Sequence, residues 1–189
     1  DELAHRIAAI RETLEETGLA LGLTGTIDAD RAADARKLAL EKGALAPVLE
    51  SFAWSLDPAA LIPFARWLPL GLAHDRIFDT RFYLADLGTG AVDVAVDETE
   101  NTSLFWTSAK DALAMADRGE ISVIFPTRRN LERLAQFTSY GEARAHAEAI
   151  PVRTITPEID KSGPHPVLRI PQDAGYPVTE EILDSAMRG

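Results

Sequence analysis

The stretch LAHRIAAIRETLEETGL, residues 3–19, decides how the beginning of the chain folds. Its larger apolar residues recur with the spacing of one face of an amphipathic helix. Gly18 follows as the typical residue just beyond a helix C-terminus. The pattern therefore predicts a helix from Leu3 to Thr17 with an apolar face directed at the core, formed by Leu3, Ile7, Ile10 and Leu14.

The opposite face of this predicted helix is acidic. At about 100° per residue, Glu12, Glu15 and Glu16 fall within about 100° of one another. Like charges four residues apart weaken a helix, and Arg11 can offset part of this repulsion by pairing with Glu15. A divalent cation would remove it, and carboxylate oxygens favour Mg²⁺ or Mn²⁺ over zinc. On the spacing alone, the favoured interpretation is a solvated acidic face without a ligand.

The composition excludes several classes of function. The chain has 189 residues, with 30 Asp and Glu against 19 Lys and Arg, and a formal net charge of −11. Nucleic-acid binding is not expected, because phosphate neutralisation requires clustered basic residues. With no cysteine, the chain can have no disulfide, thiolate zinc site or thiol nucleophile. The 46% hydrophobic share is that of a globular domain.

Caps, turn residues and changes of period predict the elements that follow. Asp28 is a suitable N-cap for one or two helices over residues 28–50, and Gly88 and Gly90 mark a turn before an alternating strand. The expected strands are 62–68, 77–87, 91–96 and 104–106, and the further expected helices are 108–117, 126–137, 141–149 and 179–187. We expect the three tryptophans, Trp54, Trp67 and Trp106, in or near the core.

Arg128 and Arg129 stand near the start of one expected helix. Two interpretations apply to them: approach to a phosphate group, or simple solvation on the surface, which we favour.

The acidic helix carries a family resemblance. The string Arg11-Glu12-x-x-Glu15-Glu16-x-Gly18, followed by Leu19, resembles the core of the Nudix box. Four further segments are similar to the branch of Nudix hydrolases that contains the peroxisomal coenzyme A diphosphatase of mammals and its bacterial relatives, and they are 63–67, 78–84, 106–113 and 125–134. Together with the box they extend over most of residues 6–150.

The resemblance implies a fold and a domain organisation. It implies an α/β fold of the Nudix type, an α/β/α sandwich with a mixed sheet, over residues 1–150. A helical insertion is expected at about 27–61, and a C-terminal appendage at 151–189. A full box begins with a Gly and another Glu, yet only ten residues precede Arg11. We therefore expect the other half of the box, and the first strands, to lie before Asp1.

The resemblance also implies a chemistry. It makes Glu12, Glu15 and Glu16 ligands of Mg²⁺ or Mn²⁺, with Arg11 and Gly18 as structural members of the box. Glu100, or Glu98 as second choice, would join the metal from a loop, although both are equally well explained as exposed acids. Either Glu12 or Glu100 would be the general base that deprotonates a water.

The resemblance implies hydrolysis of the pyrophosphate in a nucleoside-diphosphate-linked small molecule. It suggests CoA or acyl-CoA as the substrate, with ADP-ribose and dinucleotides still open. The alternative is a Nudix-fold domain that binds a nucleotide without cleaving it. We expect a cytoplasmic protein without a membrane segment, because no signal peptide, peroxisomal C-terminal address or apolar run of about 20 residues is found. A homodimer stays open.

Overall fold

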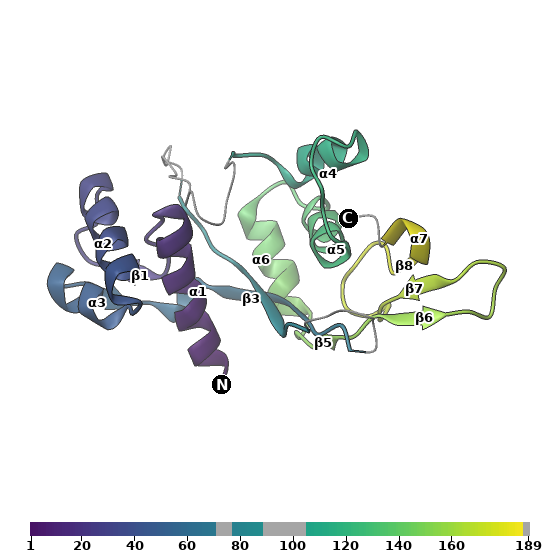
Figure 1. The fold of residues 1–189 in the computed structure, drawn as a ribbon, viewed down its shortest axis with the longest axis horizontal. Helices are drawn as coiled ribbons and strands as arrows, with labels where there is room; N and C mark the ends of the chain where they lie inside the picture. The colour runs from purple at the N-terminus through teal and green to yellow at the C-terminus, as the bar shows by residue number, and fades with distance from the viewer. Residues whose placement is uncertain (71–76, 89–104, 187–189) are drawn as a thin grey trace. The chain divides into compact units, whose positions relative to one another are not determined.

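The computed structural model describes residues 1–70, 77–88 and 105–186 (Figure 1). The chain forms two compact units, residues 1–62 with 85–106, and residues 63–84 with 107–189. The predicted strand at 91–96 lies outside the described residues, and Phe105 and Trp106 are not part of a strand. The predicted division at residue 150 stays a prediction.

The first unit begins with the predicted helix, α1 (Glu2–Thr17), capped at its N-terminus by Asp1. Ile10 and Leu14 are fully buried, and Ile7 is half-buried. Leu3 does not reach the core as predicted: it is 51% exposed, and it lies in the first turn of the helix, where Glu2, Leu3 and Ala4 are all exposed. The register of the predicted apolar face is therefore confirmed for its last three positions.

Two more helices pack in series beside α1, as Figure 1 shows. They are α2 (Ala29–Lys42), which Asp28 caps as predicted, and α3 (Ala46–Phe52). Ala35 and Ala39, one turn apart on α2, are fully buried. Such small side chains allow two helix backbones to approach closely.

Short extended segments complete the first unit. The strands β1 (Leu23–Thr24) and β2 (Ser55–Leu56) pair antiparallel, and the 3₁₀ helix η1 (Pro58–Ala60) follows them. Trp54 is buried as predicted, and its indole Nε1 donates to the Thr26 carbonyl at 2.9 Å. This bond satisfies the polar edge of a buried ring, whose centroid lies 5.1 Å from that of Phe52.

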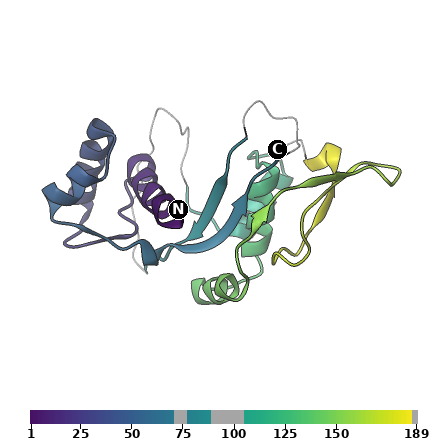
Figure 2. The same cartoon turned by 90° about the horizontal axis from the view of Figure 1, so that it is seen from below.

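The second unit contains a three-stranded sheet in the order β4-β3-β5, whose strands β3 and β4 lie side by side in Figure 2. The strands are β3 (Ile62–Trp67, with Ile62 assigned to the first unit), β4 (Thr80–Leu84) and β5 (Thr154–Ile155). β3 and β5 are parallel, with Arg66 opposite Thr154. Three helices, α4 (Ala109–Asp117), α5 (Phe125–Leu134) and α6 (Tyr140–Ala149), connect β4 to β5 along the chain and confirm the predicted helices.

A second, antiparallel sheet has the order β6-β7-β8. Its strands are β6 (Glu158–Asp160), β7 (Val167–Arg169) and β8 (Glu180–Ile182), and the short helix α7 (Leu183–Ala186) follows. The prediction of a continuous helix at 179–187 was wrong at its start, because residues 180–182 pair with β7 and Leu168 lies opposite Glu181. The α/β fold class with mixed strand pairing is confirmed.

The core of the second unit is built around Trp67, which is 1% exposed. Its ring meets those of Phe125 and Tyr176 edge to face, with centroids 5.9 and 5.8 Å away. Trp106, expected in or near the core, is 59% exposed instead, because it lies in an irregular segment just before α4. Within the described ranges, no helix combines the length and the apolar character that crossing a bilayer requires.

Candidate active site

The acidic face predicted on the first helix is present on the C-terminal half of α1. Arg11 contacts two of its carboxylates: Nη2 lies 3.3 Å from Glu12 Oε1, and Nε lies 3.5 Å from Glu15 Oε2. The expected pairing of Arg11 with Glu15 is therefore found. One guanidinium thus offsets part of the repulsion between the carboxylates of this face.

The carboxylates of this face differ in their exposure. The Glu12 side chain is 55% exposed, whereas that of Glu15 is 18% exposed. The Oε1 atom of Glu15 is buried and accepts no hydrogen bond. A buried carboxylate oxygen without a donor is costly, and a cation is one of the groups that would satisfy it.

The chemistry of these donors fits a hard divalent cation such as Mg²⁺ or Mn²⁺, which prefers carboxylate oxygens. Among the residues that the structure describes, however, no three acidic or imidazole side chains converge as a metal site. The face of α1 therefore supplies ligands of the right kind without forming a closed coordination sphere by itself. Glu98 and Glu100, the expected further ligands, lie outside the described residues.

The end of α1 is fixed by several backbone interactions. Gly18 adopts the left-handed conformation, with φ of 76°, and its N–H donates to the Leu14 carbonyl at 3.0 Å. This is the helix end predicted from the sequence, and it requires a residue that tolerates positive φ. Thr17 adds a hydrogen bond from its hydroxyl to the Thr13 carbonyl at 2.6 Å.

Arg36, on α2, is a residue that the sequence analysis missed. Its Nε donates to the carbonyl oxygen of Glu15 at 2.8 Å, and its Nη2 to that of Glu16 at 3.0 Å. No sequence signal identifies it, since the contact depends on how α2 packs against α1. Arg36 joins the segment expected to be an insertion to the helix that carries the acidic face.

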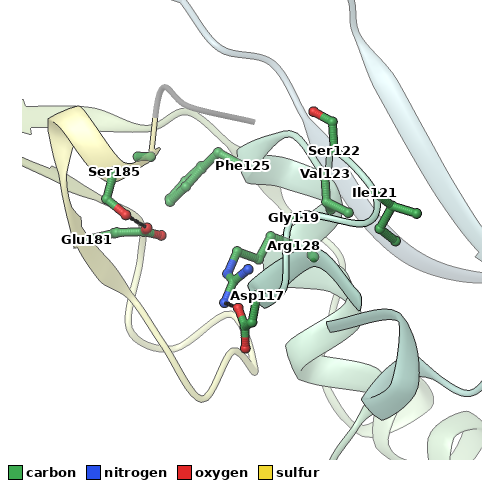
Figure 3. A pocket seen from close by; sticks show the side chains of 11 residues that line it. Asp117, Gly119, Ile121, Ser122, Val123, Phe125, Arg128, Glu181 and Ser185 are labelled. Atoms are coloured by element: carbon green, nitrogen blue, oxygen red, sulfur yellow. Dashed lines mark hydrogen bonds and ion pairs between the residues drawn. The ribbon is translucent and has the colours of Figure 1, made fainter. Parts of the chain in front are cut away.

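The second unit contains a cavity of about 450 Å³ between the end of α4, the start of α5, β8 and α7 (Figure 3). Arg128 points toward Asp117, and the two groups are 2.6 Å apart. Glu181 on the other wall accepts a hydrogen bond from the Ser185 hydroxyl at 2.6 Å. Ile121, Val123 and Phe125 provide the larger apolar side chains of its lining.

A chain of ion pairs beside this cavity corrects the expectation that Arg129 is solvated. Its side chain is 2% exposed and lies 2.8 Å from Glu132 and 3.0 Å from Glu181. Burial lowers the pKa of Arg129 and raises that of Glu132. Arg128, 30% exposed, is paired with Asp117, which raises the pKa of its guanidinium. Because both of these arginines already face carboxylates, neither of them is a free cation for a phosphate group.

A comparison of the sequence with known proteins identifies a relative. The chain is 32% identical to acyl-coenzyme A diphosphatase NUDT19 of Gallus gallus, in an alignment over 164 residues that covers 75% of this chain and 43% of that protein. The resemblance to the Nudix family is confirmed. The chain spans less than half the length of this Nudix relative. No family model matches the chain, and no solved structure matches it significantly.

Proposed function

We propose that the protein is a hydrolase of the Nudix type that cleaves the pyrophosphate of a nucleoside-diphosphate-linked small molecule, with CoA or acyl-CoA as the first candidates. The observation that carries the proposal is the acidic face of α1, which keeps a buried Glu15 oxygen without a hydrogen-bond donor. The similarity to an acyl-coenzyme A diphosphatase supports the substrate class.

Each box residue has a role in this proposal. Glu15 and Glu16, with Glu12, would hold Mg²⁺ or Mn²⁺, which lowers the pKa of a water and neutralises charge on the pyrophosphate when bound. Arg11 orients Glu15 through the contact at 3.5 Å. Glu12, with its more exposed side chain, is the better placed of the three to accept a proton from water. Glu100 remains the alternative base.

The experiment is an assay of the purified protein with Mg²⁺ or Mn²⁺ on CoA, acyl-CoA, ADP-ribose and a dinucleoside polyphosphate. We expect release of phosphorylated products from at least one of them. Glu12→Gln and Glu16→Gln should each reduce kcat by about 10²-fold or more. Glu41→Gln is the matched control and should leave kcat unchanged, because Glu41 is an exposed glutamate on α2 whose carboxylate lies 2.8 Å from the ammonium group of its neighbour Lys42.

Two further outcomes separate the alternatives. Cleavage in ¹⁸O-labelled water should label one phosphate and leave no phosphorylated protein, since water is the attacking group. A protein that binds one of these nucleotides tightly with the metal but cleaves none of them would contradict hydrolysis and favour the nucleotide-binding domain. Cytoplasmic location and a homodimer stay predictions, which fractionation and sedimentation would test.

A further inference from the structure

The C-terminal turn of α1 carries two of the proposed metal ligands. The end of a helix is also its least stable part. The last carbonyls of a helix have no intrahelical donor, and the negative end of the helix dipole lies there. Glu15 and Glu16 add negative charge to this end, and the last turn of α1 contains no basic residue. By itself, this turn is prone to fray.

Arg36 supplies from another helix what the turn lacks. Gly18 N–H satisfies the carbonyl of Leu14, and the two following carbonyls, those of Glu15 and Glu16, accept the two hydrogen bonds from Arg36. The planar guanidinium donates both at once, in the fork arrangement that lysine cannot reproduce. Its positive charge also lies at the end of the helix where a cation is favourable.

The packing of α2 fixes where Arg36 can reach. Ala35, the preceding residue, and Ala39 are both fully buried, so this side of α2 is held in the interior of the unit. Arg36 itself is half-buried, whereas Lys37, the next residue, has a side chain that is 79% exposed. Arg36 is therefore placed by the packing of α2, and not by the flexibility of a surface side chain.

We propose that Arg36 is a positioning residue that holds the C-terminal turn of α1 and thereby directs the carboxylates of Glu15 and Glu16 toward a shared divalent cation. The metal part of this inference rests on the proposed function. Because Arg36 bonds the backbone of both residues, it restricts the direction of both Cα–Cβ bonds. The segment expected to be an insertion thus becomes a support for the proposed metal ligands.

The test measures Mn²⁺ binding and amide hydrogen exchange on the intact chain, with three variants. Arg36→Met keeps the aliphatic stem and removes the donors; we expect Mn²⁺ affinity to fall about tenfold, the size of effect known for residues that orient metal ligands. The amides of residues 15–18 should exchange faster, while those of α3 keep their protection. Arg36→Lys keeps the charge and should lie between Arg36→Met and the wild type. Lys37→Met, the matched control on α2, should change neither measurement.

A folded Arg36→Met or Arg36→Lys protein with wild-type exchange and wild-type Mn²⁺ affinity would overturn the proposal. If Arg36→Met fails to fold, Arg36→Lys decides by the same two measurements. If the wild-type chain binds no Mn²⁺, the proposed metal function fails. Faster amide exchange confined to residues 15–18 in the Arg36 variants would still support the part of the proposal in which Arg36 holds the C-terminal turn of α1. The two failures are therefore distinguishable.

Discussion

The indole Nε1 of Trp67 donates a hydrogen bond to the hydroxyl of Tyr176 at 3.1 Å, although the two residues are 109 positions apart in the chain. The same hydroxyl donates to Asn130 Oδ1 at 2.8 Å. All three side chains are buried. This short polar chain connects β3, α5 and the segment before β8 in the interior of the second unit.

Tyr176→Phe should destabilise this unit. The change leaves Trp67 Nε1 and Asn130 Oδ1 buried without their partner, which costs about 1–3 kcal/mol. Urea unfolding followed by tryptophan fluorescence measures the free energy of unfolding. Tyr140→Phe, at the start of α6, is the control and should change this free energy little, because Tyr140 is only half-buried. Equal stability of the Tyr176→Phe variant and the wild type would show that the polar chain contributes nothing.

Arg129→Met should be more harmful than Arg128→Met. The first change removes a buried cation and leaves Glu132 and Glu181 without it, at a cost of about 3 kcal/mol. The second removes a partly exposed partner of Asp117 and should cost less than about 1 kcal/mol. Thermal unfolding of the two variants under the same conditions gives the comparison. The reverse order of their stabilities would contradict the structural difference between these neighbours.

Gly18→Ala and Gly43→Ala form a matched pair, because each glycine ends a helix with a positive φ, of 76° and 61° respectively. Alanine in this conformation should cost about 1 kcal/mol at either position. Only Gly18→Ala should also weaken Mn²⁺ binding, since only Gly18 follows the acidic face. Calorimetry of unfolding and of Mn²⁺ titration measures both effects. A loss of Mn²⁺ affinity in both variants would point to a general effect of stability.

Asp79 provides a prediction about pH. Arg66 donates to both of its carboxylate oxygens at 2.8 Å, and this contact lowers the pKa of Asp79. The folded state therefore binds a proton at Asp79 more weakly than the unfolded state does. The contact stabilises the fold at pH values above the usual aspartate pKa, and this stabilisation is lost as the pH falls below that pKa and through the lowered pKa of the folded state. Asp79→Asn should cost about 0.2–1 kcal/mol at pH 7.

The measurement for Asp79 is a series of thermal melts between pH 7 and about pH 3. The difference between Asp79→Asn and the wild type should shrink as the pH falls below about 4. A difference that stays constant over this range would mean that the effect of the substitution is not electrostatic.

The local features of the fold could be predicted from the sequence. The register of α1, the cap Asp28 and the end at Gly18 depend on residues within one or two turns of one another, so their pattern is visible in the chain itself. The same is true of the acidic face, whose three glutamates lie within five positions. The roles of these glutamates as metal ligands and base stay predictions.

Features that depend on distant residues could not be predicted. Residues 180–182 form a strand because they pair with β7. The pattern of residues within that segment does not indicate this pairing. Arg129 is buried because Glu181, 52 positions later, comes to lie beside it. Arg36 reaches α1 only because Ala35 and Ala39 let α2 pack into the interior. In each case the partner lies on another element, where sequence spacing carries no information.

The packing of α2 has a consequence for protein engineering. A designer who regards residues 27–61 as a removable insertion would try to replace them with a short loop. Such a shortened protein would lose Arg36 and uncover part of the surface of α1, where Ile10 and Leu14 are now fully buried. Deletion would therefore have to be accompanied by polar replacements on α1 and by a new cation beside its last carbonyls, so this segment is not a modular part of the chain.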